Sequence, residues 1–142
     1  MNFTHIRASA KDLNVHLNAM RPAYDGSDSP KLEFDLLREW VEGQHASFYK
    51  VTGKGVSLRF VGRFEESTYH IIAMTGKGLG IAAPFIIDRI RECGYDAIQY
   101  HTYRKGMRRI LNRFGFAEAQ TLRKFDGKRE TVHRLVLGSK HG

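Results

Sequence analysis

The chain has 142 residues, of which 42% are hydrophobic and 11% aromatic, and its formal net charge at pH 7 is +8. This is the length of one globular domain with one substantial core, and no apolar run reaches the roughly 18 residues that a membrane-spanning helix requires. The N-terminus has no apolar stretch of the kind that directs secretion, and the single cysteine, Cys93, excludes an internal disulfide. We therefore expect one soluble, cytoplasmic domain over residues 1–138 and a disordered tail over 139–142.

The positive charge is concentrated in the last third of the chain, between His101 and Arg134. Such an excess either forms a solvated face that keeps a protein soluble or attracts a polyanion, such as a nucleic acid or a phosphorylated cofactor. Basic residues in and just before one expected helix are the candidates for contacts with nucleic acid: Arg104, Lys105, Arg108, Arg109 and Arg113.

The first part of the chain is predicted to form one strand and two helices. Residues 3–7 can form a short strand, and apolar residues at intervals of three and four indicate a helix over 10–19. Residues 21–30 contain prolines and a glycine, which are typical of a loop. A second helix follows, with its apolar side chains again at helical spacing, and ends near Gly43.

The middle of the chain is predicted to form an antiparallel meander. Strand-like runs over 47–52, 56–65 and 68–74 are separated by short turns, the first of them Gly53-Lys54-Gly55.

After Met74 helices and strands alternate. A glycine-rich turn opens an amphipathic helix that Gly94 closes. The remaining expected elements are a strand over 97–102, a helix over 105–114, and a hairpin of strands over 117–125 and 131–137.

The order of these elements, with a glycine-rich turn between the fourth strand and the third helix, resembles the GNAT superfamily of acyl-CoA-dependent N-acyltransferases over almost the whole chain. The family's cofactor signature is Arg or Gln, two variable residues, Gly, one variable residue, and Gly or Ala. Here Thr75 stands at the first position, with Gly78 and Gly80 at the two small-residue positions. The run Arg113-Phe114-Gly115-Phe116 after an amphipathic helix is a second similarity.

The resemblance implies an α/β (α+β) fold with a central mixed, mostly antiparallel sheet of about seven strands and about four helices. It also implies that acetyl-CoA or another acyl-CoA is the co-substrate. Main-chain N–H groups at a helix N-terminus suit its pyrophosphate, because the helix dipole is positive there. Glycines let the main chain approach the phosphates closely, and Lys77 adds a positive charge.

The N–H group of Met74 would polarise the thioester carbonyl, as the resemblance implies. The cofactor-binding residues that it implies are Met74, Thr75, Gly76, Lys77, Gly78, Leu79, Gly80 and Ile81.

The sequence departs from the family pattern at three positions. Thr75 lacks the long polar side chain of the signature, and Leu111 stands where many members have a tyrosine that protonates the departing thiolate. Arg104 replaces a frequent asparagine. Other residues must therefore supply the acid and the base.

In this family the acyl group lies where the fourth and fifth strands splay apart. His101 and Tyr103, at the end of the expected fifth strand, are therefore the candidate catalytic residues. Glu65, Glu66 or His70 would act as a base through water. These side chains do not have the spacing of a metal site, so we expect none.

The function implied by the resemblance is an acyl-CoA-dependent N-acyltransferase whose acceptor amine is on or near a nucleic acid, such as DNA, RNA or aminoacyl-tRNA. Two alternatives remain open. One is a catalytically inactive GNAT-like protein with a nucleic-acid-binding or structural role, as in some viral proteins of this fold, which Thr75 and Leu111 favour. The other is an acyltransferase for small amines or protein lysines, whose positive charge serves only the cofactor's phosphates.

Overall fold

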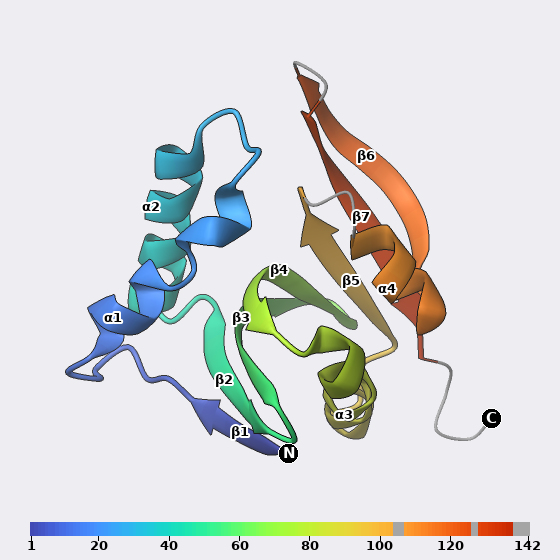
Figure 1. Cartoon of the computed structure of the whole chain (residues 1–142), viewed down its shortest axis with the longest axis horizontal. Helices are drawn as coiled ribbons and strands as arrows, with labels where there is room; N and C mark the ends of the chain where they lie inside the picture. The colour runs from blue at the N-terminus through green and yellow to red at the C-terminus, as the bar shows by residue number, and fades with distance from the viewer. Residues whose placement is uncertain (104–106, 126–127, 138–142) are drawn as a thin grey trace.

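A mixed sheet forms the centre of the computed structural model, which describes residues 1–103, 107–125 and 128–137 (Figure 1). Within these residues seven strands pair in the order β1-β2-β3-β4-β5-β7-β6, and only the β4–β5 pair is parallel. The strands are β1 Asn2–His5, β2 Ser47–Gly53, β3 Val56–Glu65, β4 Thr68–Lys77, β5 Ala97–Thr102, β6 Ala117–Phe125 and β7 Lys128–Val136.

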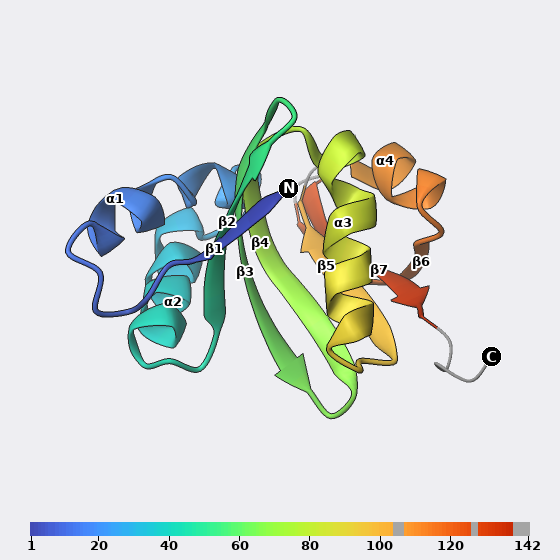
Figure 2. The same cartoon turned by 90° about the horizontal axis from the view of Figure 1, so that it is seen from below.

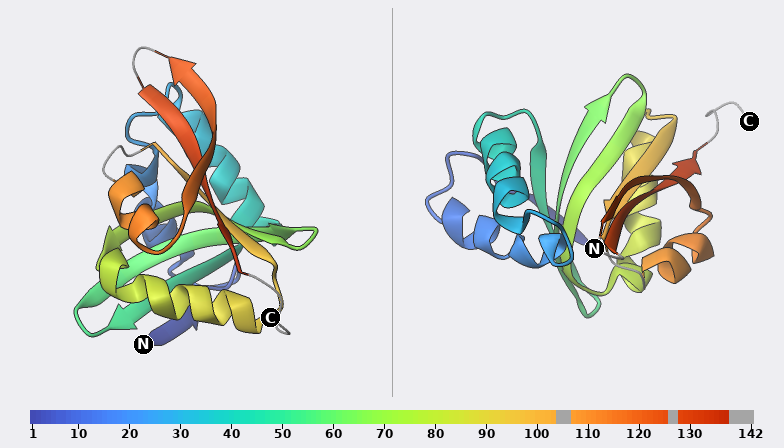
Figure 3. Two further views of the ribbon diagram at one scale, coloured as in Figure 1. Left: turned by 90° about the vertical axis from the view of Figure 1, so that its right-hand side faces the viewer. Right: turned by 90° about the horizontal axis from the view of Figure 1, so that it is seen from above.

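Helices cover both faces of the sheet (Figure 2). One face carries α1 (Leu13–Asn18), the 3-10 helix η1 (Arg21–Tyr24) and α2 (Pro30–Glu42), and the other carries α3 (Leu79–Glu92) and α4 (Met107–Arg113). A parallel pair of strands requires a crossover connection, and α3 provides it between β4 and β5. The β6–β7 hairpin projects past the end of β5 at one edge of the sheet (Figure 3).

The two helical layers create two cores. Beneath α2, the fully buried Phe34 and Val41 pack with Phe48 of β2 and Val61 of β3. On the other face, a cluster centred on Ile98 of β5 fills the space under α3 and α4. Each fully buried large apolar side chain stabilises the fold by about 1.5–3 kcal/mol.

Two features of β4 open the sheet near its centre. The pairing with β3 shifts register between Val61 and Gly62, so that Ile72 is an extra residue on β4, as in a β-bulge. The parallel pairing with β5 ends at Ile71 and Tyr100, and beyond this pair the two strands diverge (Figure 1). The splay that the sequence resemblance predicted therefore lies between residues 72–77 of β4 and the end of β5.

The predicted fold class and the order of the elements are confirmed, and the differences concern boundaries. The first helix is shorter than the expected 10–19, because the N–H groups of Ala10 and Leu13 bond to carbonyls three residues earlier and form turns instead. The expected loop over 21–30 contains η1, and β4 continues past Met74 to Lys77 by pairing with the start of β3. The expected tail over 139–142 lies outside the described residues. No helix among the residues that the structure describes is long and apolar enough to cross a membrane.

Candidate functional site

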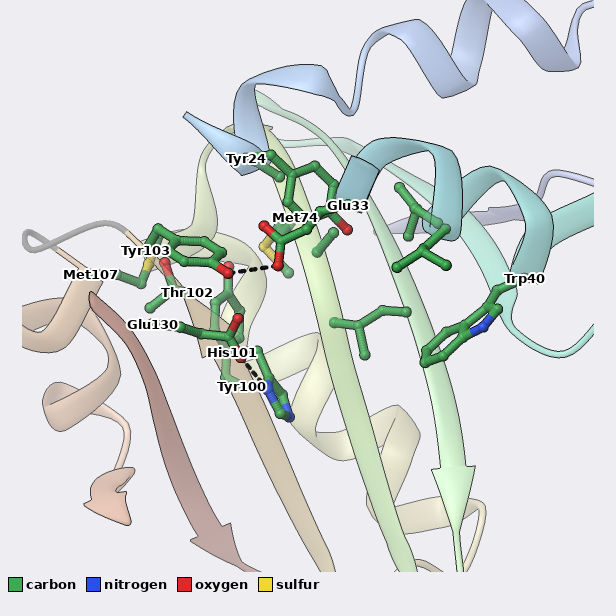
Figure 4. Close-up of a pocket in the computed structure, with 15 residues that line it drawn as sticks. Tyr24, Glu33, Trp40, Met74, Tyr100, His101, Thr102, Tyr103, Met107 and Glu130 are labelled. Atoms are coloured by element: carbon green, nitrogen blue, oxygen red, sulfur yellow. Dashed lines mark hydrogen bonds and ion pairs between the residues drawn. The ribbon is translucent and has the colours of Figure 1, made fainter. Parts of the chain in front are cut away.

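A cavity of about 230 Å³ lies between α2 and the splayed ends of β4 and β5 (Figure 4). Residues from η1, α2, both strands and β7 contribute to it, so it unites parts of the chain that are far apart in the sequence. Its lining includes both candidate catalytic residues, His101 and Tyr103, together with Ala23, Tyr24, Glu33, Leu36, Leu37, Trp40, Ile72, Ala73, Met74, Tyr100, Thr102, Met107 and Glu130.

Tyr103 is held by a carboxylate in this cavity. Its hydroxyl donates a hydrogen bond of 2.7 Å to Oε1 of Glu33 (Figure 4). The hydroxyl of Ser27 donates to Oε2 of the same side chain. Burial raises the pKa of Tyr103 above its ordinary value, and hydrogen bonding with Glu130 and Glu33 raises it further. Tyr103 therefore keeps its proton at neutral pH, which is the state that a general acid requires.

His101 lies between a carboxylate and a second histidine. Its Nδ1 is 3.4 Å from Oε1 of Glu130, and its Nε2 is 3.4 Å from Nδ1 of His70 on β4. Burial, followed by the neighbouring His101, lowers the pKa of His70 below its ordinary value. The contact with Glu130 orients the ring, which suits His101 to accept a proton in the cavity.

The cavity is acidic. Glu33 and Glu130 face it from opposite sides, and its described lining contains no lysine or arginine. Burial raises the pKa of Tyr24, and the two glutamates raise it further, so this hydroxyl also stays protonated. Such a site attracts a protonated amine and can then remove a proton from it.

The glycine-rich segment connects β4 to α3 close to this cavity, since Met74 belongs to the cavity lining. Gly78 has φ 96° and is the N-cap of α3, where no side chain caps the helix. Ile81 and Ala82 donate their N–H groups to the Gly78 carbonyl. By helix geometry the N–H groups of Leu79 and Gly80 have no acceptor within α3, so they are suited to bind an anion.

The three glycines of this segment have different structural roles. A side chain at Gly76 would collide with the Ser57 carbonyl of β3, and one at Gly78 would come within 2.9 Å of Val56. At Gly80 the nearest heavy atom to an added Cβ is Nη1 of Arg113, at 3.9 Å. Close packing against β3 therefore requires glycine at positions 76 and 78. At position 80 the packing leaves room for a side chain.

Thr75 has a structural role. Its side chain is buried, and Oγ1 donates a hydrogen bond of 2.9 Å to the Ala19 carbonyl between α1 and η1. The side chain is thus committed to the α2 face of the sheet, and a contact with a cofactor would use its main chain. Lys77 is exposed, and Leu111 is buried in the core beneath α3 and α4.

The predicted nucleic-acid surface is described only in part. Arg109 and Arg113 are exposed on α4, whereas Arg104, Lys105 and the side chain of Arg108 lie outside the described residues. Arg113 approaches the start of α3, as its distance from Gly80 shows. One arginine of this set therefore lies beside the glycine-rich segment.

Sequence reasoning missed both glutamates of the cavity. Glu33 stands in the first turn of α2 on the same side as Trp40, seven residues later, and this helical spacing was the available signal. Glu130 precedes the expected start of the last strand, which the structure extends back to Lys128. Glu65 and Glu66 are exposed at the β3–β4 turn and do not line the cavity.

Neither a protein-family model nor a curated protein matches the amino-acid sequence. Solved structures do match the fold. A protein from Desulfovibrio desulfuricans that is assigned to the GNAT family of acetyltransferases superposes with a TM-score of 0.65 at 18% identity, over 96% of this chain and 99% of that one. The ribosomal-protein-S18-alanine N-acetyltransferase of Escherichia coli gives 0.65 at 14% identity, over 96% and 95%.

A Bacillus subtilis acetyltransferase, solved in complex with CoA, gives a TM-score of 0.67 at 14% identity and covers 96% of this chain and 99% of that one. The similarity thus extends over almost the whole length of this chain and of each of these proteins. The chain has the fold of the GNAT acetyltransferases.

Proposed function

We propose that this protein is an acyl-CoA-dependent N-acyltransferase that uses acetyl-CoA or another acyl-CoA as donor. The observation that carries the proposal is the cavity at the β4–β5 splay, where a protonated tyrosine and a carboxylate-bound histidine lie next to a helix N-terminus whose first N–H groups have no acceptor within the helix. When bound, acyl-CoA supplies an activated thioester.

The residues of the cavity are suited to the proton transfers of such a reaction. His101, held by Glu130, accepts the proton that the ammonium group must lose before the neutral amine attacks, and Tyr103 donates a proton to the thiolate that leaves. The N–H groups of Leu79 and Gly80 bind the pyrophosphate, and Arg113 and Lys77 add positive charge beside them. Met74 supplies a main-chain N–H toward the acyl carbonyl.

We propose that the acceptor is an amine on or near a nucleic acid, such as DNA, RNA or aminoacyl-tRNA. The exposed Arg109 and the net charge of +8 support this acceptor. A second acceptor class, a small cationic amine or a protein lysine, is favoured by the two carboxylates of the cavity, Glu33 and Glu130. A non-catalytic role is the alternative that the buried Leu111 favours, because this position carries no hydroxyl.

A thermal-shift titration with acetyl-CoA and CoA tests the cofactor site without knowledge of the acceptor. A ligand at one hundred times its Kd stabilises the native state by about 2.7 kcal/mol, which for a chain of this size raises Tm by about 8 °C. Gly80→Val should abolish the shift, because a side chain there has room in the fold but lies where the phosphates approach.

Arg91→Val is the matched control, since it places the same β-branched residue at an exposed position near the other end of α3. This variant should keep the full shift. No shift of the folded wild-type protein with either ligand would refute acyltransfer and leave the non-catalytic role. A full shift in Gly80→Val would refute the placement of the pyrophosphate.

A further inference from the structure

A second cavity, of about 410 Å³, lies on the opposite face of the sheet from the first one. It is bounded by β1, β2 and β3 on one side and by the C-terminal half of α3 on the other, where α3 runs along this face of the sheet (Figure 2). The two cavities share no lining residue, and no residue of the glycine-rich segment contributes to this one. Its volume is in the range of small-molecule sites.

Six of the 16 residues that line this cavity are phenylalanine or tyrosine. Phe60 and Tyr69 are buried at its base, and Tyr49 stacks on Phe60 with ring centroids 5.4 Å apart. The ring of Tyr95 is 5.5 Å from that of Tyr69 and 5.8 Å from that of Phe64. Since 64% of Phe64 is exposed, the aromatic surface extends to the solvent and offers an open ring face.

A glycine within β3 positions one of these rings. A side chain at Gly62 would overlap the ring of Tyr69, and the backbone there does not have the positive φ that otherwise calls for glycine. The glycine therefore makes room for Tyr69, although it weakens the strand. Burial raises the pKa of Tyr69, so its hydroxyl remains a hydrogen-bond donor at neutral pH.

The charge at the rim is positive. Arg89 of α3 stacks over the ring of Phe3 at 4.8 Å, and His45 is exposed on the loop before β2. The described lining of the cavity contains no carboxylate. Arg63 also belongs to the lining, but its guanidinium lies over Trp40 on the other face of the sheet, away from this rim.

The aromatic lining and the positive rim of this cavity favour a ligand that has a planar ring and a negative charge. An aromatic site for a quaternary ammonium group excludes neighbouring cations, whereas this one has Arg89 at its rim. Phenol hydroxyls suit a ring with hydrogen-bond acceptors, and aromatic side chains stack on any nucleobase. We propose that this cavity binds a nucleotide, whose base stacks on Phe64 and Tyr95 and whose phosphate contacts Arg89. The nucleotide is either free or part of a single-stranded nucleic acid.

Calorimetric titration of the full chain with UMP and with an oligothymidylate, each without CoA and at saturating CoA, tests this proposal. Saturating CoA occupies the glycine-rich segment, so that the probes cannot bind there. A nucleotide that binds in the second cavity should still bind when CoA is present. Inorganic phosphate should not bind. A Kd per site that is similar for both probes indicates a free nucleotide, and much tighter binding of the oligonucleotide indicates a strand.

Phe64→Ala and Arg89→Ala should each weaken binding about tenfold, the loss expected for one stacking platform or one phosphate contact. Both side chains are exposed, so the fold should tolerate these changes. Phe85→Ala and Arg91→Ala are matched controls on α3 outside the cavity and should leave binding unchanged.

The proposal is overturned if neither probe binds, if CoA displaces both, if a trimethyllysine peptide binds instead, or if the two cavity variants bind as tightly as their controls. None of these outcomes depends on acyltransfer.

Discussion

Tyr103 illustrates how its surroundings give one side chain a chemical role. The same phenol on a solvent-exposed strand would be an ordinary surface residue. Here burial raises its pKa most, and hydrogen bonding with Glu130 of β7 and Glu33 of α2 raises it further. The hydroxyl stays protonated and points into the cavity where we propose that the thiolate leaves (Figure 4).

Tyr103→Phe should therefore lower kcat by about 10²-fold, the lower end of what general acid catalysis contributes. Release of CoA from acetyl-CoA in the presence of a panel of amines is the measurement. The thermal shift with acetyl-CoA serves as the control for folding and donor binding, and it should be unchanged. Full activity of this variant would assign the proton donor to another group.

The neighbourhood of Tyr103 could be predicted from the sequence only in part. The sequence identified His101 and Tyr103 because both lie at the C-terminal end of one predicted strand. Glu33 and Glu130 were not, because each reaches the cavity from an element that is distant in the sequence. Their placement depends on how α2 packs against the sheet and how β7 pairs with β5, whereas the spacing of Glu33 and Trp40 indicates only that they share one side of a helix.

At the scale of elements, β4 links the helical layers to the site. It contributes Met74 to the cavity, Thr75 to the layer of α1 and η1, and Gly76 to close packing against β3. The sequence motif suggested a phosphate-binding role for this run of residues as a whole. The structure divides it, because strand pairing continues to Lys77 and the helix begins only at Leu79.

Thr75→Val should lower the free energy of unfolding by about 1 kcal/mol and Tm by about 3 °C, because the hydrogen bond to the Ala19 carbonyl is lost without a change in volume. Thr52→Val on β2, at a half-buried position, is the matched control and should change Tm by less than 1 °C. Thermal unfolding monitored by circular dichroism measures both. Equal stability of Thr75→Val and the wild type would show that the hydrogen bond does not hold the layer.

At the scale of the whole molecule, the net charge of +8 and the acidic cavity have opposite signs. The long-range field attracts polyanions, whereas the local field attracts a cationic amine. Both are consistent with the acceptor that we propose, an amine carried on a nucleic acid.

Affinity for a single-stranded oligonucleotide should fall steeply as the salt concentration rises, and Arg109→Ala should reduce the slope of log K against log salt by about 1. Lys11→Ala, exposed next to α1, is the control for loss of one charge far from α4. Fluorescence anisotropy at several salt concentrations is the measurement. Identical slopes for both variants and the wild type would show that Arg109 of α4 does not contact the nucleic acid.

The short β4–β5 pairing also affects how the chain is made. The strands β1 to β4 are joined to the later strands by the parallel pairing of β4 with β5, which is four residue pairs long. Since α3 lies between β4 and β5 in the sequence, it must be synthesised before β5 can pair. A nascent chain that ends within α3 therefore presents β4 as an open edge, and open edges recruit other chains. The edge of β4 that borders the proposed active site in the finished protein is thus the edge that must be protected on the ribosome.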